Sequence, residues 1–338
     1  MVRVKRLNRF VIKKSIDKIV LNIVNRKDFV GAILFGSSVR DNVEKIGDLD
    51  IALIYNAPPS TYPSNLKKNI DDTQVDIWMY PLKYFVDVFE SSKYRDSSDT
   101  WFKTSLWIEL MRNGIIISDE NNVLKKYKYM ALKWRWRRSE IDPLICKGCS
   151  NLDIAEREID VFRKVLALRD ATYIYALSYI MSRNLVPSFR PKDIVTKVRL
   201  IKNRDLKDIF YRIQGIESLD KVDLSRVVNR VDKFISQYNS RGALVELRNA
   251  KKSLCKDDLE SCMLSLRNSI KYLSYKLIYR RFNYDFFNAS SHLKMIDMLR
   301  QRYPKVYRFY KNVHLYGYRE IDMDSIIKKL RQKFQKIQ

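Results

Sequence analysis

The first third of the chain alternates short apolar runs with turn residues, a pattern typical of a sheet covered by helices. The runs that indicate buried strands are 30–35, 48–55, 74–80 and 115–119. Apolar stripes at helical spacing predict helices at 11–24, 81–89 and 100–111. We therefore predict a three- to five-stranded mixed sheet with helices on one side.

The rest of the chain has the pattern of helices. A basic, aromatic stretch at 124–141 predicts one connecting helix, and the polar residues at 142–151 predict a boundary after it. Further helices are expected at 153–184, 193–214, 224–238, 259–282, 292–302 and 325–337. The fold class predicted is α+β: a sheet domain over 1–123, a connecting helix and linker over 124–150, and an α-helical domain over 151–338, as one large or two small bundles.

Two stretches of this helical region resemble each other. Leu168–Ala171 and Leu266–Ser269 each open a tyrosine-rich helix, and Phe189 and Phe287 follow them at equal distance. Both pairs are 98 residues apart. A duplicated bundle is one interpretation, and coincidence is the other.

Candidate chemistry lies between residues 30 and 55. Gly36 and Ser37 follow the first predicted strand as a tight turn, and a short helix expected at 38–45 would turn free amides toward an anion. Asp48 and Asp50 stand at the entry of the second strand, where alternation points both carboxylates to one face. Adjacent like charges are stabilised by a cation, and magnesium prefers such oxygen ligands.

A third carboxylate, Asp76, lies between apolar neighbours in the predicted strand 74–80. A Gly-Ser turn, paired aspartates and a further strand aspartate are the parts of a two-metal phosphoryl-transfer site. The alternative is that Asp48-x-Asp50 is a structural feature, because this pattern is common at turns and caps.

These residues carry a resemblance to a known family. Gly36-Ser37, ten further residues and then Asp48-x-Asp50 resemble the signature of the DNA polymerase β-like nucleotidyltransferase superfamily. The resemblance covers roughly the first third of the chain.

Within that superfamily, residues 36–40 are similar to the minimal nucleotidyltransferase branch, which often reads Gly-Ser-x-Ala-Arg-Gly. Arg40 matches the arginine of that motif. Asp41 stands in place of its last glycine, and Gly47 in place of the serine common before the aspartate pair.

The resemblance implies transfer of a nucleoside monophosphate from an NTP to an acceptor hydroxyl. Asp48, Asp50 and Asp76 would hold two Mg²⁺ or Mn²⁺ ions, and Asp76 could also accept the acceptor's proton. It further implies that Gly36 lets the backbone approach the phosphates and that Ser37 donates a hydrogen bond to them. Arg40 would neutralise phosphate charge or, alternatively, is a surface residue at a helix start.

The distribution of charge bears on the acceptor. The net charge is +26; residues 31–125 carry 10 basic and 14 acidic side chains, whereas 126–338 carry 46 basic and 23 acidic. The excess over 126–338 favours a polyanionic partner, with RNA bearing a tRNA-like 3′ end as the expected acceptor. Solvation of helix faces by lysine and arginine is the alternative. Other possible functions are modification of a protein or small molecule and a non-catalytic binding module.

Two further features leave alternatives open. Cys146 and Cys149 form a C-x-x-C that fits half a zinc site, a redox pair or a plain linker turn. Trp134 and Trp136 alternate with arginines, which suits base stacking or the burial of one indole against each domain.

Helical toxin partners of minimal nucleotidyltransferases carry an Arg-x4–6-His motif. Arg308 and His314 have that spacing, which we interpret as coincidence. The sequence has no long uncharged apolar stretch and no signal-peptide pattern, so a cytoplasmic protein without a membrane span is expected.

Overall fold

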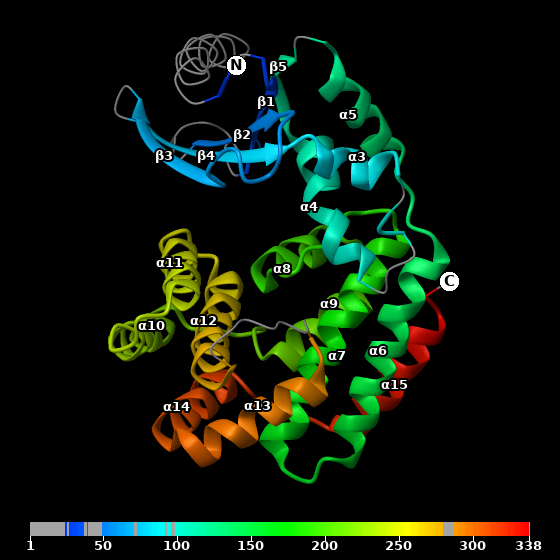
Figure 1. The fold of residues 1–338 in the computed structure, drawn as a ribbon. Helices are drawn as coiled ribbons and strands as arrows, with labels where there is room; N and C mark the ends of the chain where they lie inside the picture. Colours follow the sequence, from blue (N-terminus) through cyan, green and yellow to red (C-terminus); the bar gives the residue numbers. More distant parts are fainter. Residues whose placement is uncertain are drawn as a thin grey trace. The chain divides into compact units, whose positions relative to one another are not determined.

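A mixed sheet forms the centre of the first part of the chain in the computed structural model (Figure 1). The structure describes residues 24–25, 27–36, 39, 49–70, 73–91, 93–95, 99–119, 121–279 and 287–337. The chain divides into two compact units, Met1–Arg135 and Trp136–Gln338. The predicted helices at 11–24 and 38–45 lie almost wholly outside the described residues.

The described sheet has five strands in the order β3-β4-β2-β1-β5. Their bounds are β1 Phe29–Phe35, β2 Leu49–Tyr55, β3 Asn65–Ile70, β4 Thr73–Pro81 and β5 Ile115–Asp119. β2 and β4 pair in parallel, whereas the pairs β1–β2, β1–β5 and β3–β4 are antiparallel. The predicted mixed sheet is therefore confirmed, and β3 is a strand that the apolar pattern did not indicate.

Side chains alternate between the two faces of this sheet, as the strand period requires. One face gathers an apolar cluster that includes Leu34, Leu53 and Ile77. The opposite face buries Ile33, Ala52 and Ile54 completely. Three helices pack over it: α3 Lys83–Phe89, α4 Thr100–Asn113 and α5 Val123–Lys133.

The single connecting helix expected over 124–141 is two helices. α5 ends at Lys133, residues 134–137 are not helical, and α6 Arg138–Arg157 follows. Arg112 donates to the carbonyl oxygens of Ala131 at 2.7 Å and Trp134 at 2.8 Å. The carbonyls at the end of α5 are thus satisfied by a side chain, which lets the helix stop there.

Residues 142–151, where a domain boundary was expected, are part of α6. The two units instead meet between Arg135 and Trp136 in the sequence. Pro143 is within that helix, where its missing N–H leaves out one backbone bond, to the carbonyl of Ser139. Gly148 is helical too, and a Cβ there would approach Phe334 to 2.2 Å. The glycine thus serves close packing with the last helix rather than a turn.

The second described unit is entirely helical after α6. Its helices are α7 Val161–Ser182, α8 Pro191–Leu200, α9 Arg204–Gln214, α10 Lys221–Ile235, α11 Arg241–Cys255, α12 Leu259–Tyr279, α13 Ala289–Arg302, α14 Pro304–Leu315 and α15 Met323–Gln335. The predicted helix 153–184 is divided where Asp160 caps α7, its carboxylate accepting from the Arg163 amide at 2.9 Å. Asn203 likewise divides the predicted helix 193–214 by capping α9, accepting from the Leu206 amide at 3.0 Å. Among the described helices, none is long and apolar enough to cross a membrane.

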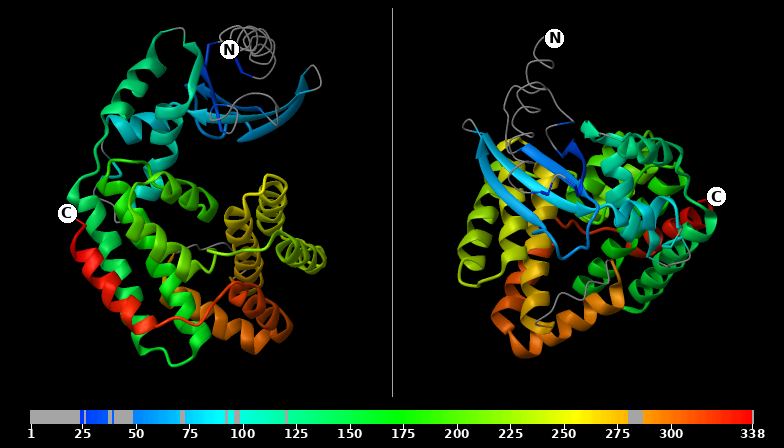
Figure 2. Two further views of the ribbon diagram at one scale, coloured as in Figure 1. Left: turned by 180° about the vertical axis from the view of Figure 1, so that it is seen from behind. Right: turned by 45° about the horizontal axis from the view of Figure 1, so that its top comes forward.

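The helices of this unit pack in a reciprocal pattern. Figure 2 shows the same helices from two further directions. α6 packs on α7 as α11 packs on α12, and α8 packs on α12 as α13 packs on α7. α10 packs on α11, and α15 packs in the same way on α6. The same contacts therefore occur twice, once from each half of the unit. The two halves, α6–α10 and α11–α15, are thus related by an approximate two-fold axis.

Two glycines mark the contact between these halves. Gly215 follows α9 with φ +60°, and Gly317 follows α14 with φ +74°. A Cβ on Gly215 would lie 2.7 Å from the Gly317 oxygen, and one on Gly317 would lie 2.4 Å from the Gly215 oxygen. Only glycine combines this left-handed backbone with so close an approach.

Candidate active site

Asp50 and Asp76 are direct partners across the parallel pair formed by β2 and β4. Neighbouring strands lie about 4.8 Å apart, and paired residues point to the same face. Both carboxylates therefore lie on the face that α3, α4 and α5 cover further along, beyond the buried Ala52 and Ile54. The sheet brings together two acidic residues that the sequence places on separate strands.

Gly36 lies directly against the carboxylate of Asp50. Phe35, the last residue of β1, pairs with Asp50, so the turn that follows β1 begins beside it. Gly36 has φ +76°, and a Cβ there would lie 2.3 Å from Asp50 Oδ2. Glycine at this position leaves the space that the carboxylate occupies. The amide of Val39 donates a hydrogen bond to the Gly36 oxygen at 3.4 Å.

Asp76 has a donor at each oxygen. Gln74 Nε2 donates to Oδ1 at 3.1 Å, and Lys67 Nζ lies 3.1 Å from Oδ2. The Lys67 side chain is 58% exposed and that of Asp76 only 16%, so the ammonium approaches from solvent. An exposed ammonium thus contacts one of the two carboxylates.

The structure describes only part of the predicted site. It brings Gly36, Asp50 and Asp76 together, whereas Ser37, Arg40 and Asp48 lie outside the described residues. Sequence reasoning missed Lys67 and Gln74. The sequence could have indicated Gln74 as a partner of Asp76, because residues two apart on a strand share a face. It could not have indicated Lys67, because the strand β3 that carries Lys67 was not predicted.

The carboxylate oxygens of Asp50 and Asp76 fit a hard divalent cation. Carboxylate oxygens on neighbouring strands are the ligands that magnesium takes, and the Lys67 ammonium already balances one of them. Across the part of the chain that is described, no three His, Cys, Asp or Glu side chains are grouped as for a metal. A third ligand would have to come from the predicted Asp48 or from substrate phosphate.

The aromatic pair of the connecting segment is buried. Trp134, 5% exposed, belongs to the first unit, where the Arg95 guanidinium lies 3.8 Å from its ring centroid. Trp136, 7% exposed, belongs to the second, where its Nε1 donates to the Leu185 carbonyl at 2.9 Å. Each unit buries one indole, so neither ring is a free surface for base stacking.

The remaining motifs fall outside any shared site. Cys146 and Cys149 lie one turn apart on α6, where the predicted linker turn is absent. Arg308 is exposed on α14, whereas His314 is buried on the same helix. The two residues of that Arg-His spacing therefore face different environments.

No family model matches the chain. No curated protein matches it either. Among solved structures the chain is similar to a nucleotidyltransferase-like protein from Exiguobacterium sibiricum 255-15, with 13% identity and a TM-score of 0.38. The match covers 86% of this chain and 91% of that chain.

Proposed function

We propose that this chain transfers a nucleoside monophosphate from an NTP to an acceptor hydroxyl. The observation that supports this most directly is the pairing of Asp50 with Asp76, with Gly36 against Asp50. A glycine turn beside two strand carboxylates is an arrangement suited to a nucleoside triphosphate and its cations.

Each residue has a role in this proposal. Asp50 and Asp76, with Asp48, would hold magnesium, which when bound polarises the phosphate and lowers the pKa of the acceptor hydroxyl. Asp76 also takes the proton that the hydroxyl loses as its oxygen attacks the α-phosphorus, and pyrophosphate leaves.

The turn after β1 serves the donor nucleotide. The backbone at Gly36 approaches the phosphates without a side chain in the way, and Ser37 donates a hydrogen bond to them. Arg40 balances their charge. These assignments rest on the motif, and the left-handed backbone of Gly36 supports the first of them.

RNA is the acceptor that we propose. Residues 126–338 carry 46 basic and 23 acidic side chains, and this excess suits a phosphate backbone. Several arginines of the helical unit are held by carboxylates, as Arg199 is by Asp258 and Glu260. Even so, the basic side chains of 126–338 outnumber the acidic ones two to one, so half of them have no acidic counterpart.

Label transfer tests the reaction. The purified protein is incubated with each α-labelled NTP, Mg²⁺ or Mn²⁺, and either total RNA or total protein. We expect label in RNA. Label in protein instead would change the acceptor but keep the reaction, and failure with every NTP and acceptor would refute nucleotidyl transfer.

A matched pair of variants ties the reaction to the site. Asp50→Asn should abolish transfer with the fold intact, because it removes ligand charge and little volume. The control is Asp87→Asn, which removes a carboxylate of α3 that pairs with Lys93 and should keep full activity. Activity retained in Asp50→Asn would contradict the assignment.

Salt tests the acceptor separately. If RNA is bound through many phosphate contacts, activity should fall at least tenfold between 50 and about 200 mM salt. Flat salt dependence would indicate a small acceptor.

A further inference from the structure

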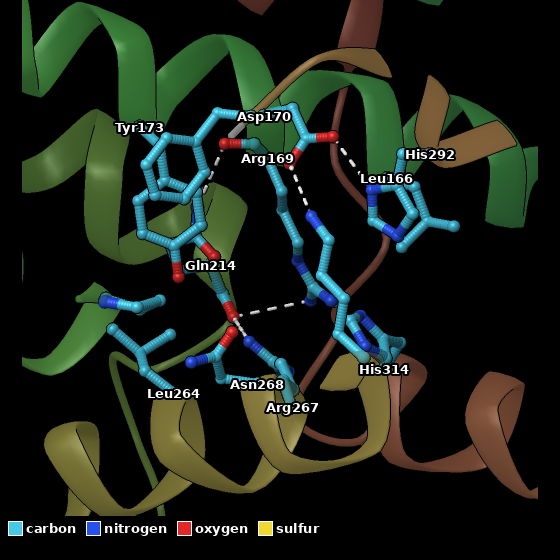
Figure 3. Close-up of a pocket in the computed structure, with 13 residues that line it drawn as sticks. Leu166, Arg169, Asp170, Tyr173, Gln214, Leu264, Arg267, Asn268, His292 and His314 are labelled. Atoms are coloured by element: carbon cyan, nitrogen blue, oxygen red, sulfur yellow. Dashed lines mark hydrogen bonds and ion pairs between the residues drawn. The ribbon is translucent and has the colours of Figure 1, made fainter. Parts of the chain in front are cut away.

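A second cluster of charged groups lies inside the helical unit, away from the sheet. A cavity of about 30 Å³ opens between α7 and α12, with Arg169, Asp170, Gln214, Arg267, Lys271 and His314 among its lining residues. Figure 3 shows Arg169 and Arg267 converging on Gln214 while Asp170 turns toward His292. The proposed nucleotidyl transfer uses none of these groups.

The two arginines of this cavity are anchored to helix ends. Arg169 donates to the carbonyl oxygens of Ile213 at 3.0 Å and Gln214 at 3.3 Å, at the end of α9. Arg267 donates to Gln214 and, at 2.7 Å, to Tyr316, just after α14. Two helix C-termini thus offset about one unit of positive charge, at roughly half a charge each.

The remaining charges leave a positive excess. Lys271 Nζ lies 3.6 Å from Asp170 Oδ1, so this pair is neutral together. His292 is saturated, its Nδ1 lying 2.7 Å from Asp170 Oδ2 and its Nε2 lying 2.5 Å from Tyr310 Oη. Two guanidinium charges against two helix ends therefore leave about one positive charge buried without a counter-ion among the residues that the structure describes.

Polar atoms without partners belong to two of the residues that line this cavity. Arg267 Nε and both ring nitrogens of His314 are buried and lack any hydrogen-bond partner among the described residues. Burial, then the charges of Arg169 and Arg267, lower the pKa of His314 well below its usual value, so the ring is neutral. A neutral imidazole carries one N–H, and the site therefore has two unused donors.

The two halves differ where the polar groups gather. Arg169 and Arg267 occupy equivalent places on α7 and α12, 98 residues apart. The other polar residues have different counterparts at this spacing of 98 residues. The position equivalent to Asp170 is Asn268, that of Lys271 is Tyr173, and that of His292 is Ile194. Asp170, Lys271 and His292 thus have no charged counterparts at the equivalent positions, so the approximate symmetry of the fold does not require them.

We propose that this cavity binds one small monovalent anion of halide size, with chloride as the occupant. Arg267 Nε and the His314 N–H donate to it, and its charge balances the buried excess. A cavity of about 30 Å³ is large enough to hold a small ion or a water molecule. Water would satisfy the donors but not the charge.

Thermal unfolding of the full chain tests this at constant ionic strength. Chloride should raise Tm by about 2–4 °C relative to gluconate, which is too large for the cavity, because an anion that binds the folded state alone stabilises it. Equal Tm values in the two salts would overturn the proposal.

Two variants locate the effect. His314→Phe keeps a ring stacked on Tyr310 but removes both nitrogens, and it should abolish the difference between chloride and gluconate. Arg308→Gln removes an exposed cation of the same helix and should keep the full difference. A difference that persists in His314→Phe would place the anion elsewhere and refute the site.

Bromide gives a direct view. Crystals grown in NaBr should show an anomalous peak in the cavity beside Arg267 and His314. A cavity that holds only water, with bromide confined to the surface, would refute the proposal. Neither result bears on nucleotidyl transfer, whose test uses Asp50.

Discussion

Asp50 and Asp76 pair directly across the parallel strands β2 and β4, and Lys67 is the residue that pairs with Asp76 from the other side. One row across three strands therefore holds two carboxylates and an ammonium. This row depends on register, because a slip of one residue would turn Asp76 into the apolar cluster that holds Val75 and Ile77. The core residues of β4 thus fix the position of the carboxylate.

Lys67 should compete with a metal for Asp76. We predict that Lys67→Met lowers the Mg²⁺ concentration for half-maximal transfer several-fold, because the ammonium no longer has to leave Asp76 Oδ2. The free energy of unfolding should change by less than about 1 kcal/mol, since the pair is largely exposed on the lysine side. A Mg²⁺ titration of activity measures this, with Lys68→Met, its neighbour on the same strand, as control. An unchanged or higher Mg²⁺ requirement in Lys67→Met would contradict the competition.

Gly36→Ala should damage both stability and activity. Its φ of +76° costs an L-residue about 1–2 kcal/mol, and the new Cβ would lie 2.3 Å from Asp50 Oδ2. Chemical denaturation should show both costs in the single variant. In Gly36→Ala with Asp50→Ala, the contact is relieved and only the backbone cost remains. The loss in free energy of unfolding caused by Gly36→Ala is therefore compared in the unaltered chain and in the Asp50→Ala chain. Equal losses in the two would exclude the contact with Asp50.

Arg169 should be among the largest single contributors to the stability of the helical unit. It is 3% exposed and donates to Ile213, Gln214 and His314 carbonyls at the ends of two helices. Arg169→Ala should lower the free energy of unfolding by about 3–5 kcal/mol, because buried carbonyls lose charged donors. Arg226→Ala, on the surface of α10, should change it by less than about 0.5 kcal/mol. Similar values for the two variants would refute this role.

The carboxylates could be predicted from the sequence, but their pairing could not. Alternation within a strand placed Asp76 between apolar neighbours and so at a sheet surface. Which residue of β2 stands beside it depends on strand order and register, which are set by contacts far apart in the chain. Asp50 and Asp76 could therefore be proposed as partners only from the motif.

Segments with weak apolar patterns were missed for physical reasons. β3 reads Asn-Leu-Lys-Lys-Asn-Ile and lies at the edge of the sheet, where lysines protect an open strand from pairing with other chains. α11 buries Ala243, Glu246, Leu247 and Ala250, of which only one is a large apolar residue. Helix packing through small residues leaves little periodic signal.

Helix ends were misplaced for the opposite reason, because a single side chain decides them. Asp160 caps the start of α7 inside an apolar pattern that runs on from α6. Arg112 ends α5 from a distant part of the sequence. A local pattern cannot contain the second kind of signal.

Acid should destabilise the helical unit before it protonates carboxylates in general. The chain has two histidines, His292 and His314, and burial is the largest cause that lowers the pKa of each. Below the unfolded value of about 6.5, the unfolded chain binds protons that the folded chain does not. The stability is therefore complete above that pH and is lost as the pH falls toward the folded pKa values, by up to about 1.4 kcal/mol per pH unit for each histidine. Denaturant melts between pH 7.5 and 5 measure the slope, which His314→Phe should roughly halve. A slope in His314→Phe equal to that of the unaltered chain would mean that His314 does not titrate as its burial requires.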